Sequence, residues 1–329
     1  MSDVVLLERS KQAFASLNEA IGQKVVGQRD VIELMIITLL ARGHGLLVGV
    51  PGLAKTLLVG TLGEALGLTS GRVQFTPDLL PADITGTDVL QEEEVNGQIR
   101  RKLRFLQGPL FSNLVLADEI NRTPPKTQAA LLQAMQERCV TVGTATHALP
   151  DPFQVFATRN PIEQEGTYPL PEAQLDRFLL EIHVGYPSRE EEESIARKTT
   201  SDDKGTVPRV LTREEVIELQ RLVPRIPVTD EAVKLAVKLG RATRPSLDES
   251  PELIKKYVRY GAGPRGSQAL VLAAKARAAL RGEPAVDLGD VRAMIVPVLR
   301  HRLVLSYRAE AEGITDREVL ASVEALAGS

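Results

Sequence analysis

The chain has 329 residues, of which 43% are apolar, so it is long enough to bury the cores of two domains. Its formal net charge of −3 excludes a basic field over the whole molecule. Its 4% aromatic content, without tryptophan, offers few platforms for stacking bases. Composition therefore does not favour a nucleic-acid partner.

Three features constrain the cellular location. Cys139 is the one cysteine, so no internal disulfide can form, as expected in a reducing compartment. The first residues place charges inside their apolar stretch and contain no signal-peptide core. The longest apolar run, residues 34–41, is far shorter than the roughly 20 residues that a membrane helix needs. We expect a cytoplasmic protein without a membrane span.

Helices alternate with short apolar strands over the first 185 residues. This alternation is typical of a parallel sheet that is covered by helices on both faces. The predicted strands are residues 44–48, 72–76, 114–117, 154–158 and 178–182. The predicted helices are residues 4–21, 30–42 with Asp30 as N-cap, 55–66, and one that starts at Pro124-Pro125.

Two hairpins interrupt this alternation. Asn96-Gly97 is a strong turn pair, and residues 98–106 supply a returning strand. Residues 139–142 form a strand that turns at Gly143.

Beyond a polar stretch at residues 199–205, the sequence predicts helices throughout. Thr212 and Glu215 form a capping box at the start of the first of them. Later helices are predicted near residues 230–243, 251–260, 264–281 and 289–300. The chain is therefore divided into an α/β core, residues 1–204, and a smaller all-α region, residues 205–329.

The loop after the strand at residues 44–48 carries the strongest functional signal. A buried strand, a Gly-containing loop ending in Lys-Thr and a helix form the layout of a phosphate-binding loop. The loop consists of Gly49, Val50, Pro51, Gly52, Leu53, Ala54, Lys55 and Thr56. Its N–H groups and the helix N-terminus converge on an anion, Lys55 points toward the β- and γ-phosphates, and Thr56 offers its hydroxyl to Mg²⁺.

Ala54 departs from the usual pattern of this loop, which has glycine there. In the first turn of a helix alanine costs little, so we expect a small effect. A positive φ at this residue would instead cost about 1–2 kcal/mol.

Two adjacent acids follow the apolar strand at residues 114–117. Because ligands bind at the carboxyl ends of parallel strands, Asp118 and Glu119 are expected beside the phosphate loop. Asp118 is predicted to hold Mg²⁺, and Glu119 to orient and deprotonate the attacking water.

Three further polar residues complete the candidate site. Asn160 ends the strand at residues 154–158, where its amide can hydrogen-bond the γ-phosphate or the water. Arg177 directly precedes the fifth strand, and Arg265 opens a helix of the second region. Arginine suits phosphate because its planar fork is always charged and donates two parallel hydrogen bonds.

Together these stretches resemble the AAA+ ATPases, and within them the MoxR family. The resemblance spans nearly the whole chain. The matching stretches are Val26–Gln28, Gly49–Thr56, Leu114–Asn121, Ala157–Pro161, Tyr168–Phe178 and Gly261–Ser267. The resemblance implies a P-loop AAA+ core with a parallel five-stranded sheet between helices, followed by a smaller all-α lid domain.

The resemblance also implies roles for single residues, with ATP and Mg²⁺ as cofactors. Lys55 and Thr56 would belong to Walker A, Asp118 and Glu119 to Walker B, and Asn160 would be sensor 1. Arg265 would be the sensor 2 arginine of the lid, and Arg177 the arginine finger donated to a neighbouring subunit. The remaining nucleotide contacts would come from Val26, Gly27 and Gln28 beside the adenine and from Leu57 after the loop.

A finger donated in trans implies a homo-oligomeric ring, expected to be hexameric. By resemblance the ring remodels a protein or metalloenzyme partner as a chaperone does, with a von Willebrand factor A domain adaptor. The two hairpins would face the pore or the axial surface of the ring.

Two other functions stay open. Arg159 stands beside Asn160 where similar sequences often carry glutamine, which leaves room for a nucleotide-dependent binding switch with little hydrolysis. The basic run at residues 100–104 leaves room for a nucleic-acid motor, although Glu92, Glu93 and Glu94 balance it. A subunit of a metal-chelating ring enzyme is a related possibility.

Overall fold

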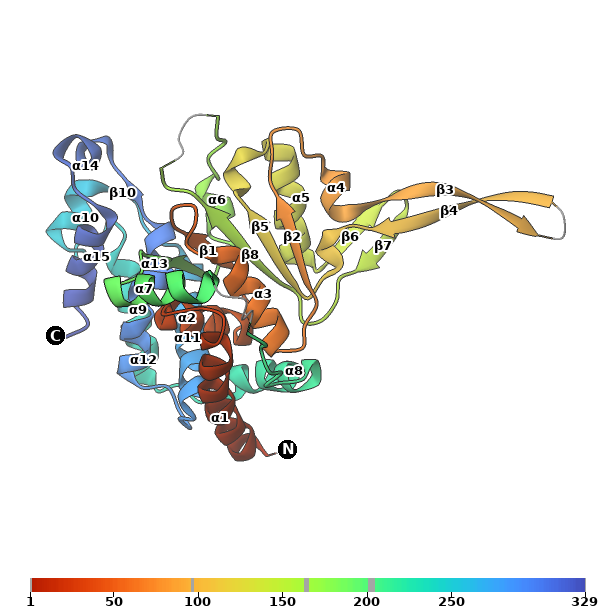
Figure 1. The fold of residues 1–329 in the computed structure, drawn as a ribbon. Helices are drawn as coiled ribbons and strands as arrows, with labels where there is room; N and C mark the ends of the chain where they lie inside the picture. Colours follow the sequence, from red (N-terminus) through yellow and green to blue (C-terminus); the bar gives the residue numbers. More distant parts are fainter. Residues whose placement is uncertain (1, 96–97, 163–165, 201–204, 329) are drawn as a thin grey trace.

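The computed structural model describes residues 2–95, 98–162, 166–200 and 205–328. Five parallel strands form its central sheet, and each lies within two residues of its predicted position. The strands are β1 (Gly45–Val48), β2 (Ser70–Gln74), β5 (Leu114–Asp118), β8 (Gln154–Arg159) and β9 (Leu180–His183). Their order in the sheet is β2-β5-β8-β1-β9 (Figure 1).

This order decides which segments meet. Because all five strands are parallel, the residues that follow β1, β5 and β8 lie at one edge of the sheet. The residues that precede β1 and β9 lie at the opposite edge. The two edges therefore carry different parts of the predicted site.

Helices cover both faces of the sheet, as predicted. Those of the first region are α1 (Asp3–Gly22), α2 (Arg29–Leu40), α3 (Lys55–Ala65), α4 (Pro81–Thr85), α5 (Pro125–Glu137), α6 (Glu172–Leu175) and α7 (Arg189–Thr199), with 3-10 turns η1 (Pro109–Phe111) and η2 (Ile120–Arg122). Leu47 and Phe156 face the core shared with α2 and α3, whereas Leu46 and Val155 face the core shared with α5. Both sets are buried because every strand in the middle of a parallel sheet has two covered faces.

The start of α2 differs from the prediction. Gln28, in the left-handed conformation with φ 59°, is the N-cap, and Asp30 lies in the first turn without capping it. The Gln28 side chain instead donates a hydrogen bond to Gly185 O at 3.0 Å. The capping role expected of Asp30 is therefore wrong, although an acid in the first turn still complements the helix dipole.

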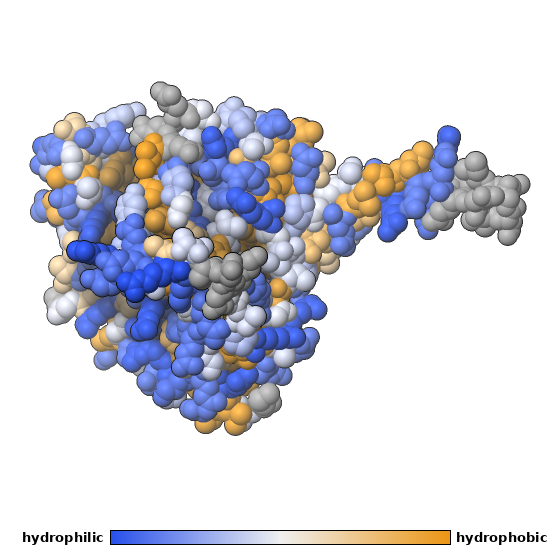
Figure 2. Space-filling view, in the orientation of Figure 1, coloured by the Kyte–Doolittle hydropathy of each residue, from blue (hydrophilic) through white to orange (hydrophobic). Residues whose placement is uncertain are grey.

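The longer of the two hairpins projects far from the body of the molecule (Figure 1). It pairs β3 (Gly86–Val95) with β4 (Gln98–Gln107), and its predicted turn, Asn96-Gly97, lies outside the described residues. Leu90 and Leu103 face each other across the pair and are both exposed, and Figure 2 shows hydrophobic surface along this projection. At its base, the Phe105 ring stacks on His147, with ring centroids 3.9 Å apart.

His147 belongs to the second hairpin. It pairs β6 (Cys139–Val142) with β7 (Ala145–Ala148), as the turn at Gly143 predicts. Both hairpins lie outside the parallel sheet.

The rest of the described chain is mainly helical. Two predicted helices differ from the structure: the one at residues 251–260 ends at Tyr257, and the one at residues 289–300 is divided at Met294. Its helices and 3-10 turns are α8 (Arg213–Leu222), η3 (Val223–Arg225), α9 (Asp230–Ala242), α10 (Glu252–Tyr257), α11 (Pro264–Arg281), α12 (Leu288–Ala293), α13 (Ile295–Leu299), η4 (Arg300–Arg302), α14 (Tyr307–Glu312) and α15 (Asp316–Ala325). The predicted capping box at the start of α8 is present: Thr212 Oγ1 accepts Glu215 N–H at 3.2 Å, and Glu215 Oε2 accepts Thr212 N–H at 2.8 Å. The prediction missed a short antiparallel pair, β10 (Val258–Tyr260) with β11 (Val304–Leu305).

The two regions share one hydrophobic core. α1 packs against α8 and α11, and buried side chains of α1, α2 and α3 join those of α8 to α13 in a single cluster. The boundary predicted at residue 205 therefore marks a change in the sequence pattern, while buried side chains from both sides of it pack together. Across the described residues, every helix is too short or too polar to cross a membrane.

Candidate nucleotide site

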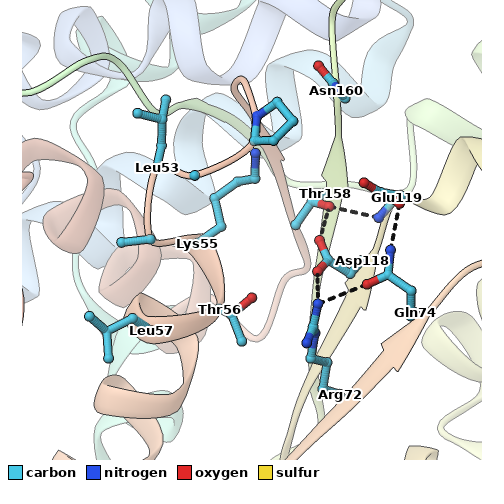
Figure 3. A pocket seen from close by; sticks show the side chains of 13 residues that line it. Leu53, Lys55, Thr56, Leu57, Arg72, Gln74, Asp118, Glu119, Thr158 and Asn160 are labelled. Atoms are coloured by element: carbon cyan, nitrogen blue, oxygen red, sulfur yellow. Dashed lines mark hydrogen bonds and ion pairs between the residues drawn. The ribbon is translucent and has the colours of Figure 1, made fainter. Parts of the chain in front are cut away.

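A cavity of about 500 Å³ lies at the carboxyl edge of the sheet, between the loop after β1 and the ends of β2, β5 and β8 (Figure 3). It is lined by Pro51, Gly52, Leu53, Ala54, Lys55, Thr56, Leu57, Arg72, Gln74, Asp118, Glu119, Thr158 and Asn160. Ten of these residues belong to the predicted site, and they come from three separate stretches of sequence. We call this space the phosphate cavity.

The loop after β1 is shaped by two special positions. A Cβ atom on Gly49 would come within 2.7 Å of Val184 O, so the close approach of β9 requires glycine there. Ala54 has φ 57° and ψ 22°, in the left-handed region, and directly precedes α3. The expectation that alanine costs little at this position is therefore wrong, and the strain is about 1–2 kcal/mol.

Lys55 reaches back over the loop. Its ammonium donates hydrogen bonds to Gly49 O at 2.6 Å and to Val50 O at 3.0 Å. Partial burial lowers the pKa of Lys55, and the negative charges of Asp118 and Glu119 oppose this shift. A cation that faces two acids across a cavity is well placed to neutralise a bound polyanion.

Asp118 and Glu119 are held by the neighbouring strand β8. The Thr158 hydroxyl donates a hydrogen bond to Asp118 Oδ1 at 2.6 Å and accepts one from Glu119 N–H at 2.8 Å. Glu119 itself has φ 57° in the left-handed region, which turns the chain sharply at the end of β5. The two acids are thereby fixed on either side of one hydroxyl.

Two residues of β2 complete a ring of hydrogen bonds around these acids (Figure 3). Arg72 donates to Asp118 Oδ2 at 2.8 Å and to Gln74 Oε1 at 2.9 Å, and Gln74 Nε2 donates to Glu119 Oε2 at 2.5 Å. Arg122 approaches the same Glu119 oxygen at 2.9 Å. The carboxylate of Glu119 is thus oriented from two sides.

The donor set fits a magnesium ion. The Thr56 hydroxyl and the Asp118 carboxylate line the same cavity, and both present oxygen, which is the ligand that Mg²⁺ prefers. One carboxylate and one hydroxyl leave the other positions to water and phosphate, as is usual for Mg²⁺ beside nucleotides.

An adjoining cavity of about 240 Å³ extends the site. It shares Gly52, Leu53, Ala54 and Leu57 with the phosphate cavity and is otherwise lined by Lys24, Val25, Val26, Gln28, Pro187, Ile195, Lys198 and Thr199. Apolar walls next to a phosphate loop suit a planar base. Three residues were predicted to lie beside the adenine, and two of them, Val26 and Gln28, line this cavity. Gly27 lies just outside it, against the Glu191 side chain.

Arg177 and Arg265 lie elsewhere. Both line a separate cavity of about 230 Å³ together with His44 and Asp176. His44 directly precedes β1 and Arg177 lies just before β9, so this cavity is at the edge of the sheet opposite to the phosphate cavity. Asp176 joins the two segments, since Arg265 lies 3.6 Å from its Oδ2 and Arg302 donates to its Oδ1 at 2.8 Å.

Sequence reasoning missed Arg72, Gln74 and Thr158. A signal for the first two was present, because residues two apart on a strand point to the same face and both are polar. Thr158 lies next to the last residue of β8 and two residues before Asn160, so its position at the sheet edge could have been predicted from the same strand. Their pairing with the acids depends on the strand order, which the sequence alone does not give.

Comparisons with known proteins agree with this geometry. Residues 44–180 match the ATPase family associated with various cellular activities (AAA), and residues 251–323 match the AAA lid domain. Chaperone MoxR1 of Mycobacterium tuberculosis is 44% identical over 302 residues, which make up 90% of this chain and 77% of that protein. Protein MoxR of Paracoccus denitrificans is 34% identical over 91% of this chain and 89% of that protein. The crystal structure of a candidate ATPase from Cytophaga hutchinsonii has a TM-score of 0.86 at 39% identity, over 96% of this chain and 95% of that one.

A parallel sheet with the Gly49–Thr56 loop after β1, paired acids at the end of β5 and a helical region that matches the AAA lid domain defines the class of AAA+ ATPases. The relatives place the chain more narrowly. It belongs to the MoxR family.

Proposed function

We propose that this protein binds ATP with magnesium and hydrolyses it within a ring of identical subunits, acting on a protein client as a chaperone does. The observation that carries this proposal is the phosphate cavity, which unites Lys55, Thr56, Asp118, Glu119 and Asn160. These residues supply the positive charge, the metal ligands, the base and the amide that phosphoryl transfer to water requires.

Binding follows from the loop and the adjoining cavity. The N–H groups of the loop and the N-terminus of α3 receive the phosphates, and Lys55 exchanges its two carbonyl partners for phosphate oxygens. Thr56 and Asp118 would hold the magnesium ion, which neutralises charge between the β- and γ-phosphates when it is bound. Val26, Gln28 and Leu57 surround the base.

Glu119 is the base in this proposal. Gln74 and Arg122 orient its carboxylate, and the Asn160 side chain lines the same cavity. A water molecule between Glu119 and the γ-phosphate would lose its proton to Glu119 as it attacks the phosphorus. Asn160 would hold that water or a γ-phosphate oxygen by its amide.

Arg177 is proposed to act on the nucleotide of the neighbouring subunit. It lies at the sheet edge opposite to the phosphate cavity of its own chain, so a head-to-tail ring would bring it to the next cavity. Arg265 lies in the same cavity as Arg177, which supports delivery of both arginines together. The sensor 2 role of Arg265 would then also be exerted in trans. An arginine finger contributes about 10³–10⁵ in rate, so an isolated subunit would be nearly inactive.

The client, the adaptor and the ring size are proposed by analogy with the family. One relative is named a chaperone, which supports a protein client for this chain as well. A hexamer and a von Willebrand factor A domain adaptor remain predictions, as does a cytoplasmic location. The projecting hairpin β3–β4, with Leu90 and Leu103 exposed, is the surface that would contact a client at the pore or the axial face.

Neither alternative function gains support. Arg159 lies 3.8 Å from the buried Glu181, so its charge is directed away from the nucleotide, and the hint of a binding switch weakens. On the hairpin, Arg101 pairs with Glu92 at 2.9 Å, as expected of a solvated face and not of a nucleic-acid contact.

The test combines calorimetry with phosphate release. Glu119→Gln should bind ATP with magnesium within about threefold of the parental affinity, while its turnover falls at least about 100-fold. Glu310→Gln, the same change on the exposed surface of α14, is the matched control and should leave both values unchanged. A well-folded parent that takes up no ATP would refute the binding site, and parental turnover by Glu119→Gln would refute the base.

A further inference from the structure

The lid is separated from the nucleotide of its own chain. Among the described residues, the phosphate cavity and the adjoining cavity are lined by none beyond Thr199. Arg265, the lid residue that the sequence assigns to the phosphates, lies at the opposite sheet edge. A lid that responds to its own nucleotide must therefore receive the signal through the core.

Glu181, on β9, is a buried acid of that core that has no role in the proposed reaction. Its side chain is 3% exposed, and a buried carboxylate is costly unless charged partners surround it. Arg159 of β8 lies 3.8 Å from Oε2, whereas His183 lies 2.6 Å and Arg300 of η4 lies 3.8 Å from Oε1. Oε2 thus faces β8, which ends at the phosphate cavity, and Oε1 faces both His183 of its own strand and Arg300 of the lid.

The first side of this arrangement is tied to the nucleotide site. Arg159 directly precedes Asn160, which lines the phosphate cavity. Its carbonyl also accepts the N–H of Gly49, the first residue of the phosphate loop, at 3.3 Å. A movement of the loop or of Asn160 therefore shifts Arg159 relative to Glu181.

The second side is tied to the lid. Arg300 donates two hydrogen bonds to Asp316 at the start of α15, at 2.6 and 3.0 Å, so it moves with that helix. The next two residues dock the same turn on the segment before β9. His301 Nε2 lies 2.9 Å from Phe178 O, and Arg302 donates to Asp176 at 2.8 Å.

We propose that Glu181 couples the nucleotide site to the lid, with Arg159 as the positioning residue that reports the state of Asn160. This inference rests on the proposed function, since it needs a nucleotide in the phosphate cavity. Two arginines face one carboxylate that is itself buried, and burial of the carboxylate strengthens its electrostatic interactions. The position of Arg159 therefore changes how firmly Glu181 holds Arg300. The lid then loosens or tightens with nucleotide state although none of its described residues lines the nucleotide cavities.

Amide hydrogen exchange of residues 300–305, which comprise η4 and β11, tests this coupling in the full chain. Exchange is compared with ADP and with a non-hydrolysable ATP analogue, after calorimetry has shown that each variant binds both. In the parent the two nucleotides should give exchange rates that differ by about fivefold or more, at the lower end of coupling between sites. In Arg159→Gln, which loses the charge, the two rates should become equal, while Arg159→Lys should retain at least part of the difference.

Asp316→Asn is the matched control, because it weakens the hydrogen bonds that Arg300 donates to its other partner and leaves β8 unchanged. It should raise the exchange rate of residues 300–305 with both nucleotides and leave the ratio of the two rates unchanged. The coupling is overturned if the two nucleotides give equal exchange rates in the parent. It is also overturned if Arg159→Gln keeps the parental ratio of the two rates. Absence of nucleotide binding in the parent is a separate result that contradicts the proposed function.

Discussion

The hydroxyl of Thr158 and the carboxylate of Asp118 form a 2.6 Å hydrogen bond between neighbouring strands, directly beside the phosphate loop. Thr158 is buried and accepts the N–H of Glu119 with the same oxygen. A single hydroxyl therefore holds the side chain of Asp118 and the backbone of Glu119. This bond links the metal-binding residue and the base of the proposed reaction.

Replacing Thr158 with valine should disturb both acids. Valine keeps the shape but leaves the N–H of Glu119 without its acceptor, which should lower the free energy of unfolding by about 1–3 kcal/mol. The misaligned acids should also lower turnover roughly ten- to 100-fold. Urea unfolding and phosphate release measure the two effects.

Thr158→Ser is the matched control, since it keeps the hydroxyl and loses only a methyl group. It should retain turnover within about threefold of the parent. Equal turnover in the serine and valine variants would show that the hydroxyl does not position the acids.

Ala54 offers a stability test. Its φ of 57° is strained for alanine, and glycine adopts this conformation freely. After allowing for the greater freedom of glycine in the unfolded chain, Ala54→Gly should raise the free energy of unfolding by about 0.5–1 kcal/mol. Ala129→Gly, on the exposed face of α5, should lower it by about 0.5–1 kcal/mol because that residue is in a right-handed helix. Destabilisation by both changes would contradict the left-handed conformation of Ala54.

His44 makes stability depend on pH. It is buried before β1, its Nδ1 accepts Val155 N–H at 3.0 Å, and its Nε2 lies 3.1 Å from Met135 O, so the neutral ring is required. Burial lowers the pKa of His44 to about 4, from about 6.5 in the unfolded chain. Because the unfolded chain then binds the proton more readily, the free energy of unfolding should fall as pH decreases from about 6.5 to about 4.

Between pH 7 and pH 4.5 this single group should account for a loss of about 2–3 kcal/mol. Urea unfolding of the parent and of His44→Asn at both values isolates the effect. The variant should have a lower free energy of unfolding than the parent at pH 7, but this free energy should fall less between pH 7 and pH 4.5. His301, whose pKa burial also lowers, leaves a residual slope in the variant. If the free energy of unfolding depends on pH equally in the parent and the variant, His44 is not held neutral.

The sequence predicted the parts of the site that are continuous in the chain. The loop at residues 49–56 and the Asp118-Glu119 pair each carry their strand, turn and charged residue within a few positions, so local pattern was sufficient. Asn160 was predicted because it ends an apolar strand. All of these residues line one cavity, except Gly49 and Val50, whose carbonyls hold Lys55.

The remaining features depend on contacts between distant segments. Arg72 and Gln74 reach the acids because β2 lies beside β5, and sequence patterns do not give the order of strands in a sheet. The place of Arg265 depends on how the lid docks through the turn at residues 300–302, far along the chain from α11. The left-handed conformations of Gln28 and Ala54 are imposed by the packing around them, since neither residue type favours positive φ.

The most direct test of the account is the mixing of two inactive variants. Arg177→Ala subunits keep an intact phosphate cavity, and Glu119→Gln subunits keep an intact Arg177, so neither should hydrolyse ATP alone. In mixed rings an intact cavity meets an intact arginine at some interfaces. With random assembly from equal amounts, activity should return to about a quarter of the parental rate. A mixture as inactive as its two components, in rings shown to contain both, would contradict a site completed by the neighbouring subunit.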